Sequence, residues 1–407
     1  MRTIFHVDAN SAYLSWTAVE RLKNGEKDDI RLAYAAIAGD PLTRRGIILA
    51  KSDSAKACGI RTGETIREAM GKCPGLTLYA PDHDMYARYS DAMYEVLSRY
   101  SPVIERFSID ECYLDYTASE SLFGPPLEAA RRLKDEIKSR LGFTVNVGVS
   151  VNKILAKMGS ELEKPDKVHS LFPSEIEAKM WPLPIGALYS VGRSSRARLE
   201  AAGIRTIGDA ARADRGFVIS LLGKAHGGTV HDYANGVDGS PVVPTGESGR
   251  KGISNSTTTA SDVKSLEEAD KVLLWLSDKV GSRLRKRGYY AKVVSVSMRP
   301  ADFSKRPYGH QRRLDIPIHT TDAIYAEAKA LFRRAWKGEP IRNMGIHCNE
   351  MTDSPEGQLS MFMDTPLAGD AVFPAVSAGE PEGAEELDKA VDAIRERFGK
   401  DAVKRGL

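Results

Sequence analysis

The chain lacks any apolar run long enough to cross a membrane. Its 407 residues contain no stretch of about eighteen consecutive apolar residues, which is near the minimum for a transmembrane helix. The N-terminal segment MRTIFHVDAN has the pattern of a strand and lacks the apolar core of a signal peptide. We therefore expect a protein without a membrane anchor or export signal, located in the cytoplasm.

Cysteine is scarce and scattered. The chain has 4 cysteines, and no two of them form a CxxC pair: Cys58, Cys73, Cys112 and Cys348. This spacing excludes the usual zinc-binding modules and a disulfide framework. Sparse, unpaired thiols are typical of a reducing compartment.

Excess charge of one sign is small overall but unevenly distributed. The net charge is +3, yet residues 245–345 hold 20 Lys and Arg against 11 Asp and Glu, and residues 349–407 hold 6 against 13. A basic segment followed by an acidic one suggests a module that binds a polyanion such as nucleic acid, with a separate appendage. An ordinary solvated surface is the alternative. The length favours three or four domains.

The order of predicted elements in the N-terminal half has the pattern of a split βαβ sheet. Alternation of apolar residues predicts strands, and helical spacing predicts helices. The strands are expected at 2–7, 103–109, 111–116 and 143–150, and the helices at 82–99 and 125–141. This β-α-β-β-α-β order is the split βαβ arrangement. The segment from about 11 to 76 is inserted after the first strand and is expected to form a small domain.

Two adjacent acids interrupt the strand-like segment RFSIDECYLD. Neighbours on a strand point to opposite faces, so Asp110 and Glu111 can act together only where the strand bends. Asp8 ends the first strand, which lies centrally in a split βαβ sheet, beside the hairpin. Three converging carboxylates repel one another unless cations bind them, and carboxylate oxygens suit Mg²⁺. A pair of exposed acids at a hairpin tip is the alternative.

Four motifs occur together in order: HVDANSAYLSW, SIDECYLD, GVSVNKILAKMGSELEKPDKV and QLSMF. In combination they resemble the Y-family translesion DNA polymerases of the bacterial polymerase IV and polymerase V type, over nearly the whole chain. The resemblance implies an α+β multidomain fold with a split βαβ (ferredoxin-like) palm, small fingers, a helical thumb and an α/β little finger. The implied boundaries are 1–10 and 77–165 for the palm, 11–76 for the fingers, 166–240 for the thumb, 241–251 for a linker, 252–348 for the little finger and 349–407 for a flexible acidic tail.

The resemblance also implies the catalytic and metal-binding groups. Asp8, Asp110 and Glu111 would bind two Mg²⁺ ions, which Mn²⁺ can replace, together with the backbone carbonyl of Ala9. Tyr13 matches the steric gate that excludes a ribose 2′-hydroxyl, and a core aromatic is the alternative for it.

The expected contacts to the nucleotide phosphates come from Ser11, Ala12, Lys56 and Lys164, with plain surface lysines as the alternative for the last two. The fingers depart from the usual polymerase IV pattern. Asp53 stands where a Tyr is usual, Lys56 where an Arg is usual, and Ala12 where an aromatic is frequent. These departures make the fingers look closer to the polymerase V branch.

The expected DNA-binding regions lie further along the chain. Residues 190–204 resemble a helix-hairpin-helix element, with Gly192, Arg193 and Ser194 at a turn that contacts the DNA backbone. An ordinary helical hairpin is the alternative. In the basic region, helices are expected at 266–287 and 321–337 and strands at 291–299 and 310–318. Arg285, Lys286 and Arg287 end the first of these helices, where they serve either DNA or the helix dipole.

The composition of the tail predicts disorder up to residue 383. Within it, Gln358, Leu359, Met361 and Phe362 resemble the motif by which bacterial polymerases bind the sliding clamp, with a segment that folds back on the body as the alternative. Residues 384–398 have the pattern of an amphipathic helix without an evident partner.

The resemblance thus implies a monomeric, nucleoid-associated bacterial enzyme that takes primer-template DNA and deoxynucleoside triphosphates, and that lacks a proofreading exonuclease. The rival hypotheses are a class III nucleotide cyclase, which uses a similar sheet, and a non-catalytic DNA-binding relative.

Overall fold

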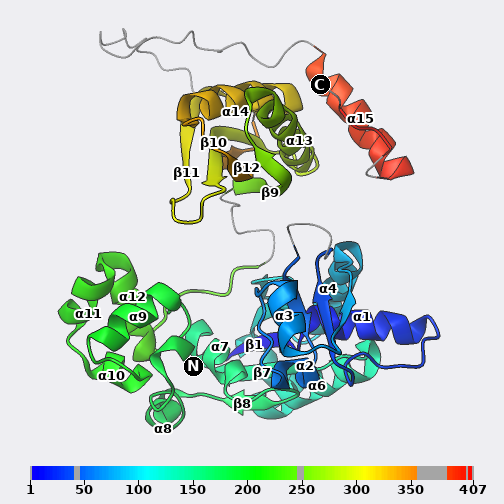
Figure 1. The fold of residues 1–407 in the computed structure, drawn as a ribbon. Helices are drawn as coiled ribbons and strands as arrows, with labels where there is room; N and C mark the ends of the chain where they lie inside the picture. The colour runs from blue at the N-terminus through cyan, green and yellow to red at the C-terminus, as the bar shows by residue number, and fades with distance from the viewer. Residues whose placement is uncertain (1, 41–45, 245–251, 355–382, 400–401, 406–407) are drawn as a thin grey trace. The chain divides into compact units, whose positions relative to one another are not determined.

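The computed structural model describes residues 2–40, 46–244, 252–354, 383–399 and 402–405 (Figure 1). The described residues up to 244 form one compact unit, and those from 252 form a second. Each unit has its own apolar core. Among the described residues, no helix combines the length and the apolar character that a membrane span requires.

The first unit is built around a five-stranded sheet in the order β5-β6-β1-β7-β8. β1 is central and pairs antiparallel with both β6 and β7. The expected split βαβ arrangement is therefore confirmed. The strands are β1 (Ile4–Ala9), β5 (Ile104–Arg106), β6 (Glu111–Asp115), β7 (Val145–Ser150) and β8 (Val168–Ser170), and the two helices of the motif are α4 (His83–Leu97) and α6 (Pro126–Leu141).

Local sequence sets the ends of these helices. α6 begins at Pro126, whose missing N–H costs nothing in the first turn, and ends before Gly142, whose φ of 81° is left-handed. Asp82 caps α4 by accepting from the Met85 N–H at 2.9 Å. Both helices bury their apolar stripes against one face of the sheet.

A third helix, α7 (Lys153–Glu161), packs against β7 and β1. Its approach to the sheet depends on Gly148 of β7, because a Cβ there would lie 1.9 Å from the carbonyl oxygen of Ala156. All six residues of β1 are consequently buried. Phe5 and Val7 face the core with α4 and α6, whereas Ile4 and His6 face α7.

The inserted segment forms a small layer of its own. Its sheet has the order β3-β2-β4, and helices α2 and α3 enclose a separate apolar cluster with it. The elements are α1 (Ala12–Lys23), β2 (Ala35–Ala38), β3 (Ile48–Lys51), α2 (Asp53–Ala57), α3 (Ile66–Lys72) and β4 (Thr77–Tyr79). β4 pairs with β2, so this sheet extends three residues past position 76.

After β8 the described chain of the first unit is helical. These helices share a third apolar cluster with α7, which fixes this region against the five-stranded sheet. They are α8 (Ile176–Lys179), α9 (Arg193–Ala201), α10 (Ile207–Arg212), α11 (Arg215–Leu222) and α12 (Lys224–Ala234), and the short α5 (Glu120–Phe123) precedes them in the chain.

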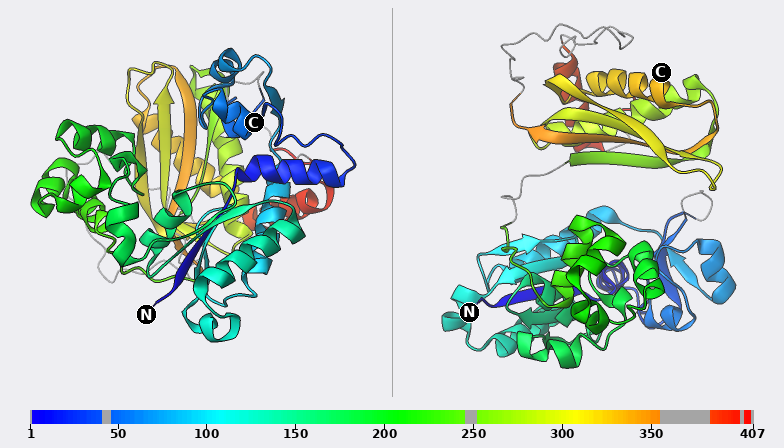
Figure 2. Two further views of the ribbon diagram at one scale, coloured as in Figure 1. Left: turned by 90° about the horizontal axis from the view of Figure 1, so that it is seen from below. Right: turned by 90° about the vertical axis from the view of Figure 1, so that its left-hand side faces the viewer.

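The second unit is a four-stranded antiparallel sheet in the order β11-β10-β12-β9, with two helices on one face (Figure 2). The elements are β9 (Gly252–Val263), α13 (Leu266–Arg285), β10 (Tyr290–Pro300), β11 (Tyr308–Ile318), α14 (Thr321–Ala335) and β12 (Ile341–Thr352). The sequence predicted the helices α13 and α14 and the strands β10 and β11, but it missed the strands β9 and β12. β12 continues four residues past 348, into the segment expected to begin the tail.

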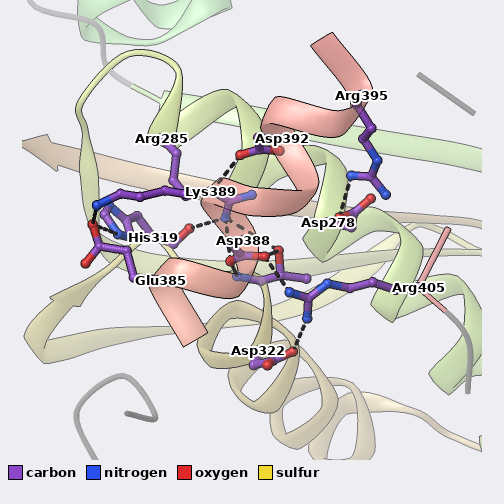
Figure 3. Close-up of polar contacts among 11 residues, drawn as sticks. Asp278, Arg285, His319, Asp322, Glu385, Asp388, Lys389, Asp392, Arg395 and Arg405 are labelled. Atoms are coloured by element: carbon purple, nitrogen blue, oxygen red, sulfur yellow. Dashed lines mark hydrogen bonds and ion pairs between the residues drawn. The ribbon is translucent and has the colours of Figure 1, made fainter. Parts of the chain in front are cut away.

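The C-terminal helix α15 (Ala384–Phe398) docks on α13 and α14 through charged side chains (Figure 3). Arg285 donates to Asp388 at 2.7 Å and to Asp392 at 2.8 Å, and Arg395 donates to Asp278 at 2.9 Å. These pairs place α15 antiparallel to α13. They also bury Arg285 in ion pairs at the C-terminal end of α13, which leaves its side chain 5% exposed.

Asp388 also caps α14 from outside. Thr320, the N-cap residue of α14, makes no capping bond with its own side chain. Asp388 instead accepts from the Thr321 N–H at 2.8 Å and from the Thr321 hydroxyl at 2.9 Å. Arg405 joins Asp388 and Asp322, each at 2.5 Å. The helix whose partner the sequence did not reveal is thus part of the second unit.

Candidate active site

The bend between β5 and β6 resolves the question raised by two adjacent acids. β5 ends at Arg106 and β6 begins at Glu111. The N–H groups of Phe107 and Ser108 both donate to the Glu111 carbonyl, at 3.0 and 3.2 Å. Asp110 therefore precedes the strand, and its carboxylate accepts from the Ser108 hydroxyl at 2.5 Å. Because Asp110 is outside the ladder, strict alternation does not separate the two acids.

Asp8 lies directly opposite Glu111 in the β1–β6 register. Both side chains fall on the face of the sheet that α7 covers. Carboxylate oxygens of Asp8, Glu111 and Glu161 all lie within 4.8 Å of one another. Asp110 is not in this group, but the Ala9 N–H donates to its carbonyl at 3.0 Å, which ties it to the end of β1.

Sequence reasoning missed Glu161. It ends α7, four residues after Lys157, so helical spacing places both on one side of that helix. The motif containing it was recognised, but the acid itself carried no separate signal. Its position in the cluster depends on the close packing of α7 on Gly148.

One cavity of about 870 Å³ brings most of the predicted site residues together. Its lining comes from β1, the start of α1, β3, α2, the β5–β6 bend and the segment after α7. The predicted residues among the lining are Asp8, Ala9, Ser11, Ala12, Tyr13, Lys56, Asp110, Glu111 and Lys164, and Arg31, Lys51, Asp53, Thr144 and Glu161 also contribute. Acids and cations in one lining suit a substrate that carries both metal ions and phosphates.

Lys164 neutralises the most buried of these acids. Its ammonium donates to Asp8 and, at 2.8 Å, to Glu161. Burial raises the pKa of Asp8 to about 6; Lys164 opposes this rise, and Glu111 and Glu161 add to it. Burial alone would lower the pKa of Lys164, but Asp8 and Glu161 more than offset it and the pKa is raised. The Lys164 ammonium thus favours the charged form of Asp8 and opposes the effect of burial.

Tyr13 lies between the apolar core and the cavity. Its ring stacks on Tyr86 with 4.2 Å between centroids and 7° between planes, and His83 contacts it edge-on at 5.9 Å. Tyr86 is fully buried, and its hydroxyl lies 3.1 Å from the Thr17 hydroxyl. Tyr13 therefore packs on the core, yet it also lines the cavity.

Lys56 and the predicted residues outside the cavity lining lie in three places. Lys56 is exposed on α2, whose N-terminus Ser52 caps by accepting from the Ala55 N–H at 3.1 Å. Gly192 is the N-cap of α9, and Arg193 and Ser194 begin that helix, all outside the cavity lining. The predicted clamp motif, residues 358–362, lies outside the described residues.

Comparisons with known proteins agree along the chain. Residues 7–161 match the impB/mucB/samB family, and residues 250–361 match the impB/mucB/samB family C-terminal domain. The chain is 41% identical to DNA polymerase IV of Clostridium acetobutylicum, over 100% of this chain and 98% of that protein. The chain belongs to the Y-family DNA polymerases. It is also 35% identical to DNA polymerase IV of Acetivibrio thermocellus, over 100% of this chain and 97% of the relative.

The fold of a solved Y-family structure agrees as well. The Y-family DNA polymerase chimera Dbh-Dpo4(243-245)-Dbh aligns with a TM-score of 0.74 and 22% identity, and the alignment covers 86% of this chain and 99% of that one. This likeness confirms the expected fold class. The likeness of the fingers to the polymerase V branch, suggested by Ala12, Asp53 and Lys56, stays a prediction.

Proposed function

We propose that this Y-family chain is a template-directed DNA polymerase of the error-prone, lesion-bypass type, which adds deoxynucleotides to a primer 3′-hydroxyl. The observation that carries the proposal is that Asp8, Asp110 and Glu111 line one cavity together with the cations Arg31, Lys51, Lys56 and Lys164. The two DNA polymerase IV relatives, matched over nearly their whole length, support it.

The carboxylates fit two Mg²⁺ ions, with Mn²⁺ as a substitute. The donors are hard oxygens, as Mg²⁺ prefers, and Asp8 is buried beside two further acids, an arrangement that cations stabilise. Asp8, Asp110 and Glu111 would hold the ions, together with the carbonyl of Ala9. The chemistry that these ions supply when bound is activation of the 3′-hydroxyl and stabilisation of the leaving pyrophosphate.

The other cavity residues would bind and select the nucleotide. Lys164 and Lys56 would hold the triphosphate as point charges, together with the backbone at Ser11 and Ala12. The ring of Tyr13, fixed by Tyr86, would leave no room for a 2′-hydroxyl. Catalysis would then consist of positioning and charge neutralisation without a covalent enzyme intermediate.

DNA and the sliding clamp would be bound elsewhere on the chain. The N–H groups and cation at Gly192, Arg193 and Ser194 would contact the duplex backbone, and the second unit would grip DNA through its basic residues. Residues 358–362 would bind the clamp. The small size of the inserted segment favours an open site.

Primer extension on undamaged and abasic templates with Mg²⁺ tests the proposal. We expect extension by the native chain on both templates, and none by Asp110→Asn, because that variant loses a metal-binding charge. Duplex affinity of Asp110→Asn should stay within about twofold of native. DNA binding without extension by the native chain would support the non-catalytic relative instead, and cyclic nucleotide formation would support the cyclase.

A further inference from the structure

Lys157, on α7, is a buried cation for which the proposed function gives no role. Only 8% of the residue is exposed, and its ammonium donates to a carboxylate oxygen of Glu111 at 2.7 Å. A lysine is seldom buried this far unless it is paired. The pair therefore joins a proposed metal ligand to the helix that packs behind the sheet.

Two aromatic rings enclose the same ammonium. It lies 5.3 Å from the ring centroid of Phe107 and 5.3 Å from that of Tyr189, within cation–π range. Phe107 belongs to the β5–β6 bend, where its N–H donates to the Glu111 carbonyl. Tyr189 belongs to the helical region after β8 and stacks on Tyr233 of α12. Three segments of the first unit thus converge on one side chain.

We propose that Lys157 is a positioning residue for the polymerase reaction: it fixes the Glu111 carboxylate at the metal-binding edge, and Tyr189 couples that position to the helical region after β8. The proposal rests on the proposed function. A glutamate side chain has several rotatable bonds, and groups bonded to a metal ligand commonly set its orientation. Because the side chains of Lys157 and Glu111 are only 10% and 17% exposed, solvent screens this pair less than an exposed one. A shift of Tyr189 when this region binds DNA would therefore reach Glu111.

Lys153 provides a matched control on the same helix, one turn earlier. Its side chain is 14% exposed against 10% for Lys157, and it also lies over an aromatic ring, that of Tyr113 at 4.7 Å. It pairs with Glu105 at 2.7 Å, which is not in the metal-binding group. Lys153→Met therefore removes an equal buried charge without releasing Glu111.

The first measurement is Mn²⁺ binding to the DNA-free protein, followed by electron paramagnetic resonance. Loss of a group that orients a metal ligand typically weakens binding or activity about 10–100-fold. We expect Lys157→Met to raise the Mn²⁺ dissociation constant about tenfold. Lys157→Arg, which keeps the charge, should bind Mn²⁺ nearly as tightly as the native chain. Lys153→Met should change the dissociation constant less than about twofold. If Lys157→Met and Lys153→Met behave alike, the proposal is wrong.

The second measurement is single-nucleotide incorporation. We expect Lys157→Met to lower kcat about 10–100-fold with a KM for the nucleotide within about threefold of native. The reason is that Glu111 would hold the ion that activates the primer 3′-hydroxyl, whereas Lys164 and Lys56 would bind the nucleotide. An equal loss in Lys153→Met would contradict this. Thermal unfolding checks each variant, and Lys157→Gln carries the same expectation if Lys157→Met does not fold.

A double-mutant cycle tests the link to Tyr189. Tyr189→Leu alone should lower kcat several-fold, and it should have no further effect in the Lys157→Met background, because both changes act on one contact. Fully additive effects would remove Tyr189 from the proposal. If the native chain extends no primer, the proposed function fails, whereas the Mn²⁺ measurement still decides whether Lys157 positions Glu111.

Discussion

Replacing Asp388 by Asn should markedly destabilise the second unit. The Asp388 side chain is 1% exposed and contacts two arginines as well as the first turn of α14. Removing one partner of a buried ion pair typically costs about 3–5 kcal/mol, because the opposite charge stays buried. Asn keeps the shape and some of the capping, so we expect about 3 kcal/mol, the lower end of that range. That is a large share of the roughly 5–15 kcal/mol that stabilises an ordinary domain.

Hydrogen exchange with mass spectrometry on the full chain measures this loss where it occurs. Amides of α13 and α14 should exchange about 100-fold faster in Asp388→Asn, since each 1.4 kcal/mol is a factor of ten. Amides of α4 and α6 in the first unit should be unchanged. Glu386→Gln, which removes an exposed charge from the same helix, is the control and should leave both units as they are.

Equal exchange in Asp388→Asn and Glu386→Gln would refute the reasoning, because α15 would then contribute nothing to the unit. Exchanging the two charges of the Asp278–Arg395 ion pair tests the docking of α15 on α13 more directly. Asp278→Arg and Arg395→Asp should each destabilise α13, and the two together should recover part of the loss if the antiparallel docking is right.

Three further predictions concern the cavity and the tail. Tyr13→Ala should admit ribonucleotides in primer extension, and Tyr86→Leu should do so more weakly, because it removes the ring on which Tyr13 stacks; unchanged sugar selection in both would exclude Tyr13 as the gate. Asp166→Asn should raise the KM for nucleotides several-fold, and an unchanged KM would contradict this. The reason is that Asp166 accepts hydrogen bonds from Lys134 and Lys138 of α6, at 2.7 Å each, and so fixes the segment that carries Lys164. Phe362→Ala should abolish stimulation by a sliding clamp without changing clamp-free extension, and retained stimulation would move the clamp site elsewhere.

The sequence predicted elements best where their apolar spacing is regular. α13 carries Ala269, Leu273, Leu276, Val280 and Leu284 on its buried stripe, which is a clear helical period. β9, by contrast, reads GISNSTTTASDV, in which most positions are polar although Ile253 and Val263 are buried. Such a strand is recognised only through its pairing with β12, and the paired residues lie 78 to 97 positions apart in the sequence.

The docking of α15 shows another limit of sequence patterns. An amphipathic helix is expected to bury its apolar side. In α15 the small Ala384 and Val391 are buried, but the larger Leu387, Ile394 and Phe398 are 53%, 40% and 66% exposed. The charged Asp388, by contrast, is buried. Charge pairs between positions more than a hundred residues apart leave no periodic signal, so the partner surface had to come from the structure.

The site was predictable to the extent that it follows from strand topology. The end of β1 and the β5–β6 bend must meet in a split βαβ sheet, so Asp8, Asp110 and Glu111 could be placed together from the order of elements. Glu161 and Lys157 could not be placed in the site from the sequence, because their distance from Asp8 and Glu111 depends on how closely α7 approaches the sheet at Gly148. Packing distances of this kind are tertiary, and residue spacing alone does not encode them.

The position at which β12 ends limits how far the second unit could lie from a sliding clamp bound to the predicted motif. The last residue described before residues 355–382 is Ser354, and Gln358 follows only four residues later. Four residues span at most about 14 Å even when fully extended. A ring-shaped clamp that bound residues 358–362 would therefore hold the second unit within a short distance of its surface. Replacement of this enzyme by another polymerase would then have to begin with dissociation of the peptide, because the enzyme could not move away from the clamp while the peptide stayed bound.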